Sequence, residues 1–188
     1  TSKTYIFQLR THQQDPDTIF WQNVAKNYID LPSEQITVSH NNSFFTYYKL
    51  NNSVKLSTSS FNDGEAWTNE QLQGLPQNVV LQSLGNDEIE GDNIWYVLDE
   101  TNRVHMSRDG KIWTLPLINQ SYSVFSIFGK MPSYTDDFIL IVIKENDTYK
   151  FAKTIDFSTI TVLNEVPQGF PVYDFTSTTI IDPLNYNA

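Results

Sequence analysis

Two segments of the chain read DGEAW (residues 63–67) and DGKIW (residues 109–113), so the pattern Asp-Gly-x-x-Trp recurs at a spacing of 46 residues. Two more positions in this frame, at spacings of 46 and 47, keep the acid and an apolar residue four places later: Asp17 with Trp21, and Asp156 with Ile160. A fixed period of this length is the signature of a repeat architecture. The sequence therefore predicts four repeats of about 46 residues.

Each full repeat also contains four short β-rich segments separated by turn residues. In the second repeat these are residues 36–40, 44–50, 54–59 and a strand that starts near Ala66. In the third they are residues 79–84, 94–98, 104–107 and 112–115, and in the fourth residues 124–129, 138–144, 149–154 and 160–163. A four-stranded meander of this length is typical of a β-propeller blade. The pattern therefore predicts an all-β, β-propeller-like fold.

The two ends of the chain hold partial repeats. The first repeat, residues 1–32, contains only a third and a fourth strand, at residues 4–9 and 18–24, and the last repeat supplies a first strand from Val172 and little more. Pro183 makes the C-terminal segment a poor second strand because proline cannot donate to a β-ladder. We expect residues 1–188 to form a single propeller domain that closes by sharing a blade between its ends, or part of a larger ring.

The recurring Asp-Gly pair is first of all a turn signal. Glycine accepts positive φ, and an Asp carboxylate accepts hydrogen bonds from backbone N–H groups of its own turn. The Trp that follows is expected to pack as a large apolar plug. The residues to which we assign this structural role are Asp17, Trp21, Asp63, Gly64, Trp67, Asp109, Gly110, Trp113 and Asp156.

The segments SFNDGEAW (residues 60–67) and SRDGKIW (residues 107–113) resemble the Asp-box, Ser-x-Asp-x-Gly-x-x-Trp, of sialidase-like and sortilin-like propellers. The second segment is one residue short of that pattern, and in the first the acid directly precedes Gly64. The resemblance implies a structural turn between the third and fourth strands of a blade, at the periphery. The phrases THQQDPD (residues 11–17) and GFPVYDF (residues 169–175) also resemble an uncharacterised family of exported Bacteroidetes propeller proteins. That resemblance implies a periplasmic or cell-surface location and a ring that continues past Ala188.

Composition excludes several classes of partner and site. The chain has 12 Lys and Arg against 22 Asp and Glu, and its net charge of −10 opposes binding to a phosphate backbone. It contains no cysteine, which excludes disulfides and thiolate metal sites. No apolar run approaches the ~20 residues of a transmembrane helix. The polar start, Thr1 to Thr4, lacks a signal-peptide core, so we expect any export signal to have been removed.

Catalytic patterns are weak. Sialidases bind the substrate carboxylate with three arginines, whereas the three arginines of this chain, Arg10, Arg103 and Arg108, fall on strand edges or in the Asp-Gly turn. A pair of carboxylates remains possible as general acid and nucleophile, on the face that carries the turns between second and third strands. On that face the candidate binding residues are Asp99, Glu100 and Arg103, together with the aromatic Tyr122.

No metal or cofactor is expected. His12, His40 and His105 lie in different repeats, without the spacing that presents two imidazoles to one metal. The acidic run at residues 86–93 offers oxygen ligands for calcium, but it lacks the alternating spacing of an EF-hand and is better interpreted as a solvated hairpin loop.

These observations favour a non-catalytic, exported interaction module that binds a glycan or a protein partner. The alternatives are a glycoside hydrolase-like propeller enzyme that uses paired carboxylates, and a structural domain of a surface protein.

Overall fold

The computed structural model describes residues 2–3, 7–11, 19–23, 30–31, 34–60, 67–116, 123–131, 136–170, 172–174 and 179–181. Before residue 34 and after residue 172, only the backbone of the strands is described. The regular elements in these segments are all strands, and none of the segments forms a helix that could cross a membrane. The all-β prediction is therefore confirmed. The chain divides into two compact units, Thr1–Gln71 and Leu72–Ala188.

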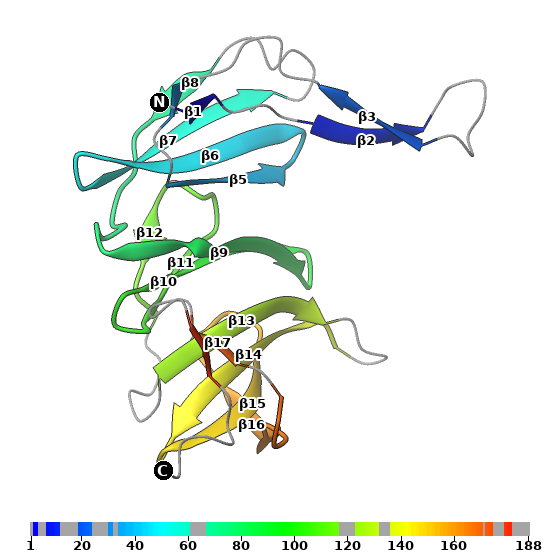
Figure 1. Ribbon diagram of the computed structural model, residues 1–188, viewed down its shortest axis with the longest axis vertical. Helices are drawn as coiled ribbons and strands as arrows, with labels where there is room; N and C mark the ends of the chain where they lie inside the picture. Colours follow the sequence, from blue (N-terminus) through cyan, green and yellow to red (C-terminus); the bar gives the residue numbers. More distant parts are fainter. Residues whose placement is uncertain are drawn as a thin grey trace. The chain divides into compact units, whose positions relative to one another are not determined.

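The described residues of the first unit form three antiparallel sheets (Figure 1). Two of them have two strands each: β1 (Ser2–Lys3) with β4 (Asp30–Leu31), and β2 (Phe7–Thr11) with β3 (Ile19–Asn23). The third is a four-stranded meander of β5 (Gln35–His40), β6 (Ser43–Leu50), β7 (Ser53–Ser60) and β8 (Thr68–Glu70). The fourth strand begins after Trp67, slightly later than the sequence predicted.

The second unit holds two four-stranded antiparallel meanders and one short hairpin. The first meander comprises β9 (Val79–Ile89), β10 (Asp92–Asp99), β11 (Val104–Ser107) and β12 (Trp113–Thr114). The second comprises β13 (Ser123–Met131), β14 (Phe138–Glu145), β15 (Thr148–Thr154) and β16 (Thr161–Glu165). β17 (Val172–Asp174) pairs with β18 (Thr179–Ile181), so the last repeat has a second strand ahead of Pro183 that the sequence did not predict.

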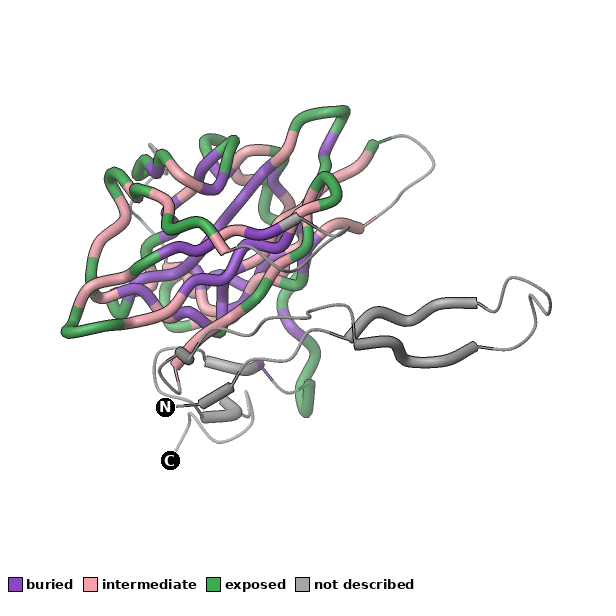
Figure 2. The backbone as a smooth tube through the Cα atoms, turned by 90° about the horizontal axis from the view of Figure 1, so that it is seen from above, coloured by how far each residue is buried: buried purple, intermediate pink, exposed green. Residues whose placement is uncertain are grey.

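Tight turns fix the register of these meanders. Four hairpins are closed by two residues that both have positive φ, as a type I′ turn requires. The pairs are Asn41–Asn42, Asn51–Asn52, Glu90–Gly91 and Asn146–Asp147. Asn, Asp and Gly adopt this conformation at the lowest cost, so short polar side chains recur where the strands reverse. Figure 2 shows the resulting pattern, with buried residues along the strands and exposed residues at the turns.

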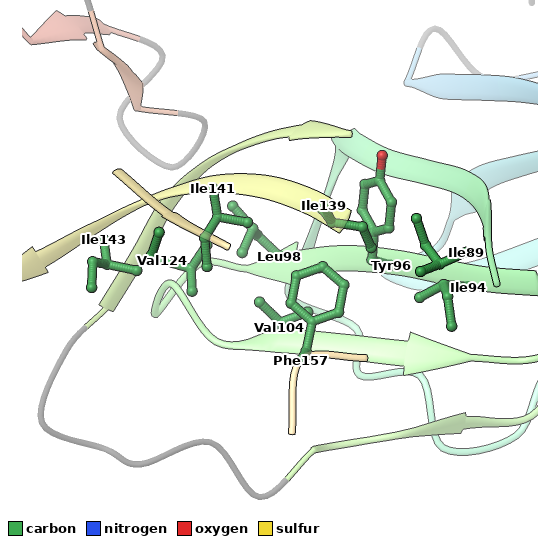
Figure 3. Packing of buried hydrophobic residues seen from close by; sticks show 11 residues of the cluster. Ile89, Ile94, Tyr96, Leu98, Val104, Val124, Ile139, Ile141, Ile143 and Phe157 are labelled. Carbon is green, nitrogen blue, oxygen red and sulfur yellow. The ribbon is translucent and has the colours of Figure 1, made fainter. Parts of the chain in front are cut away.

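The main core of the second unit lies between its two meanders (Figure 3). Alternation along β14 directs Ile139, Ile141 and Ile143 to the face that meets β10, and all three are fully buried. Leu98 of β10 belongs to the same cluster. Each fully buried branched side chain contributes about 1.5–3 kcal/mol to folding, so this cluster is the main apolar contribution to the stability of the second unit.

The opposite face of the β13–β16 meander carries a second, more aromatic cluster. Val142 and Tyr149 pack there against Val172 of β17, so the short hairpin covers part of this face. Phe151 contacts Phe128 and Phe170, with ring centroids 6.4 and 5.4 Å apart. Phe128 and Phe170 remain 44% and 37% exposed, which leaves an apolar patch beside the hairpin.

The acidic run at residues 86–93 differs from the predicted loop. β9 and β10 continue through it and reverse at Glu90–Gly91, so the run forms the end of a two-stranded ribbon. The Asp87 carboxylate accepts hydrogen bonds from the Tyr96 hydroxyl (2.9 Å) and the Lys130 backbone N–H (3.0 Å). Asp87 thus links this ribbon to β13. Burial, together with the charge of Asp87 and its hydrogen bond, raises the pKa of Tyr96 far above its usual value.

We expect Ile141→Ala to lower the free energy of unfolding by about 2–5 kcal/mol, because it removes buried methyl groups and leaves a cavity between the meanders. Ile155→Ala is the matched control, since Ile155 is 45% exposed, and it should change stability by less than about 1 kcal/mol. Urea unfolding followed by tryptophan fluorescence measures both. Equal losses in the two variants would contradict this assignment of the core.

Candidate functional site

Three of the candidate binding residues, Asp99, Glu100 and Arg103, lie at the loop between β10 and β11. Asp99 and Arg103 face each other across it, with an Asp99 N–H to Arg103 O bond of 2.9 Å. Asn102 has a φ of 60°, and its N–H donates to the Asp99 carbonyl at 2.9 Å. A type I turn followed by a left-handed residue closes three-residue hairpin loops in this way. The corresponding turns β6–β7 and β14–β15 have only two residues, so this loop is longer than its counterparts.

The Asp99 carboxylate is fully buried and receives donors on both oxygens. Its Oδ1 accepts from the Thr101 N–H and hydroxyl (2.8 and 2.6 Å) and from the Arg103 N–H (3.1 Å). Its Oδ2 accepts from Nε and Nη2 of Arg103 (2.9 and 2.8 Å). His105 Nε2 lies 3.0 Å from Oδ2 and is the donor, because an ionised carboxylate only accepts. Six contacts therefore occupy this group.

These contacts determine the ionisation of Asp99. Burial alone would raise the pKa of Asp99, but the hydrogen bonds from Thr101, His105 and Arg103 outweigh burial and hold that pKa far below its usual value. A general acid needs a raised pKa and access to the substrate. Asp99 has neither, so its carboxylate orients its neighbours and does not exchange protons with a substrate near neutral pH.

Arg103 presents a charged group of this cluster to solvent. Its side chain is 55% exposed, although its Nε and Nη2 both donate to the Asp99 carboxylate. A guanidinium carries five N–H donors, of which Asp99 takes two. Among the described residues, no acceptor binds the remaining three, which are one N–H of Nη2 and both N–H groups of Nη1. The neighbouring Glu100 is exposed as well.

The loop is attached to the backbone on two sides. The Glu100 N–H donates to the Asn78 carbonyl (2.9 Å), just before β9. The Asn102 carbonyl accepts from the Val124 N–H (3.3 Å), near the start of β13. The loop thus sits at the edge of the second unit where β9 and β13 begin, and both attachments hold its backbone in place.

The turn between β11 and β12 contains the strongest copy of the repeated sequence. Asp109 Oδ1 accepts from the N–H groups of Lys111 (2.8 Å) and Ile112 (2.9 Å) and from the Ser107 hydroxyl (2.9 Å). Ser107 Oγ in turn accepts from the Gly110 N–H at 2.9 Å, and Gly110 has a φ of 73°. Trp113 is buried, and its Nε1 donates to the Gly110 carbonyl (3.2 Å).

The turn between β15 and β16 repeats this geometry with different residues. The Thr154 hydroxyl accepts from the Phe157 N–H (2.8 Å), as Ser107 does from Gly110. Asp156 Oδ1 accepts from the Ser158 N–H (2.9 Å) and hydroxyl (2.7 Å). Phe157 takes the position of Gly110 with a φ of 59°, a strained conformation for a bulky residue. Its ring is fully buried and lies 5.7 Å from that of Tyr96, so core packing compensates for the strain.

Both acids of these turns are held ionised. Burial opposes ionisation of Asp109, but hydrogen bonds from Ile112, Lys111 and Ser107 lower its pKa overall. The pKa of Asp156 is lowered for the same reason, chiefly by Ser158 against the effect of burial. These carboxylates act as fixed acceptors for backbone N–H groups.

A comparison with family models matches residues 15–188 to the DUF6242 beta propeller domain, which is nearly the whole chain. The chain belongs to the DUF6242 beta propeller domain family. The expectation of an uncharacterised propeller family is thus confirmed. Neither a curated protein nor a solved structure matches the chain.

Some predicted residues of this DUF6242 chain lie outside the described part: Asp17, Asp63, Gly64 and Tyr122. Trp21 falls in β3, opposite Leu9, and Trp67 directly precedes β8 and is partly buried. The structure thus brings Asp99 and Arg103 together, with Glu100 next to them on the same loop. The described residues contain no group of three histidine or acidic side chains that could hold a metal ion.

Sequence reasoning missed three residues of the DUF6242 site and its turns. His105 lacks the spacing of a metal ligand and the sequence predicts no other role for it, yet it lies two residues after Arg103 and contacts Asp99. Thr154 stands two residues before Asp156, as Ser107 does before Asp109, and this hydroxyl spacing was a readable signal. Phe157 gave no signal, because a phenylalanine does not suggest positive φ.

We expect Asp99→Asn to lower the free energy of unfolding by about 2–4 kcal/mol at neutral pH, since an amide cannot accept all the hydrogen bonds of the carboxylate. Because folding lowers the pKa of Asp99, its contribution is complete above its unfolded value of about 3.9 and declines as pH falls toward the folded pKa. The difference between wild type and variant should therefore shrink below about pH 4. Urea titrations from pH 7 to pH 3 measure it.

Asp147→Asn is the control for this experiment, because the Asp147 side chain is 94% exposed and pairs only with Lys144 at the surface. Its effect should stay below about 1 kcal/mol at every pH. A pH-independent difference between wild type and Asp99→Asn would contradict the ionic role of Asp99.

We expect Asp109→Ala to lower the free energy of unfolding by about 1–3 kcal/mol, because two backbone N–H groups lose their acceptor. Asp92→Ala serves as the control, since the Asp92 side chain is 72% exposed and only pairs with Arg108. Its effect should be below about 1 kcal/mol. Similar losses in both variants, measured by thermal unfolding, would show that the Asp109 turn contributes nothing specific.

Proposed function

We propose that this chain is a non-catalytic, exported interaction module that binds a glycan or a protein partner. The observation that carries the proposal is the difference between the acid and the guanidinium of the candidate site. Its buried acid, Asp99, is saturated by donors and strongly ionised, while its guanidinium, Arg103, is exposed and held in one position. Such an arrangement supports recognition of a ligand better than it supports acid–base chemistry.

The aromatic patch on the β13–β16 meander supports the same proposal. Phe128 and Phe170 keep exposed rings in contact with Phe151. Aromatic rings contribute large contact area at low conformational cost in binding surfaces. Export, with a periplasmic or cell-surface location, belongs to the proposal through the resemblance of residues 11–17 and 169–175 to exported propeller proteins.

The proposal includes the repeat itself. Each four-stranded meander is one propeller blade of about 46 residues, with partial blades at the two ends of the chain. The turns at Asp109 and Asp156 serve as Asp-box-like elements of these blades, and this role is supported by their shared hydroxyl–carboxylate hydrogen bonds.

The test is a glycan-array and peptide-array screen of the purified chain, followed by hydrolysis assays on every glycan that binds. We expect saturable binding without turnover. Hydrolysis that is lost in Glu100→Gln but retained in Glu90→Gln, at the opposite end of the same sheet, would overturn the proposal in favour of an enzyme. Absence of binding to every probe would also overturn it.

A further inference from the structure

We infer that the Nη1–Nη2 edge of Arg103 binds a carboxylate of a protein partner, an Asp or Glu side chain displayed among basic residues. This inference rests on the proposed interaction function and specifies its ligand. A guanidinium has two edges that each match the two oxygens of a carboxylate. Asp99 occupies the Nε–Nη2 edge, which leaves the Nη1–Nη2 edge of a side chain that is 55% exposed.

Arg103 differs from an ordinary surface arginine because its position is set before any ligand arrives. The Asp99 carboxylate that holds it is fully buried and is itself fixed by Thr101 and His105. A free arginine loses substantial rotamer entropy when a partner orders it, and prior ordering removes most of that cost. Arg103 therefore offers a rigid donor edge.

Arg108 provides the contrast within the same sheet. It pairs with Asp92 at 3.0 Å, but the two side chains are 50% and 72% exposed, so solvent competes for both groups. Exposed ion pairs of this kind restrict the two side chains only weakly and contribute little to the free energy of folding. The difference between the two arginines is the burial of the paired carboxylate.

The loop also departs from the regular pattern of the fold. The turns between second and third strands in the other two meanders are two-residue hairpins closed by Asn51–Asn52 and Asn146–Asp147. The β10–β11 loop is longer, and its backbone is tied to Asn78 and Val124. Pairing of the strands does not require this extra length, and the longer loop places Arg103 beside the buried Asp99.

Charge favours a protein as the source of the carboxylate. The chain carries a net charge of −10, which repels a polyanion such as a uronic-acid polymer at long range. A basic protein is attracted instead, and a single Asp or Glu on its surface meets Arg103 while its cations meet acids such as the exposed Glu100.

The experiment compares two lysine-rich peptides that differ by one residue, a central Glu or a central Gln, by NMR titration of the full chain. We expect the Glu peptide to bind at least about ten-fold more tightly, which corresponds to about 1.4 kcal/mol. Arg103→Gln should abolish this preference. Arg103→Lys should lose most of it, because lysine keeps the charge without the two-donor edge.

Arg108→Gln is the matched control, since it removes the same charge from the same sheet and should leave the preference unchanged. Thermal unfolding of each variant verifies the fold. A preference that survives in Arg103→Gln, or equal binding of both peptides to the wild type, would overturn the inference. Tighter binding of trigalacturonate than of the Glu peptide would overturn the assignment to a protein partner. Equal binding of the two peptides would overturn this inference but not the proposed interaction function, which is overturned by the failure of every array probe or by the Glu100-dependent hydrolysis described above.

Discussion

A sheet with apolar side chains on both faces has to be covered on both faces, and this constraint governs the second unit. β14 is the clearest case, because Ile139, Ile141 and Ile143 face one side while Val142 faces the other. If either face were left in contact with water, folding would lose about 25 cal/mol of stabilisation for each Å² of apolar surface that stayed exposed. The neighbouring meander covers the isoleucine face, and β17 begins to cover the other. The loop that presents Arg103 is attached to the second meander as well, through the hydrogen bond from the Val124 N–H to the Asn102 carbonyl.

The period of the sequence was sufficient to predict the class of fold. Alternation and turn residues were sufficient to predict the strands of the three meanders, and the structure adds that Asn-Asn and Asn-Asp pairs close several of the reversals. The acidic run at residues 86–93 was misjudged for a physical reason. Its charges suggested a loop, but a two-residue turn at Glu90–Gly91 lets both strands continue through it. The polarity of residues 86–93 therefore predicted the ends of β9 and β10 less well than the turn at Glu90–Gly91 would have done.

The candidate site was predictable only in part. The charges of Asp99, Glu100 and Arg103 on one predicted second-to-third strand turn are visible in the sequence and predict a candidate site there. The burial of Asp99 and its contact with His105 depend on cross-strand register, in which His105 lies opposite Val97 and faces the same side as Asp99. That register follows from the length of the loop, which spacing alone did not reveal. The structure was therefore needed to distinguish Asp99, a buried acceptor, from Arg103, an exposed donor.

The two-residue hairpins have a further consequence for how the chain reaches its structure. In each meander every strand pairs with its neighbour in sequence, so the contact order within a sheet is low. Hairpins of this kind form in about 1–10 μs, long before distant parts of a chain find one another. Strand pairing is therefore a local event in each meander, and stacking of the finished sheets is the non-local step. A chain that emerges slowly from the ribosome can complete one meander before the next has been synthesised.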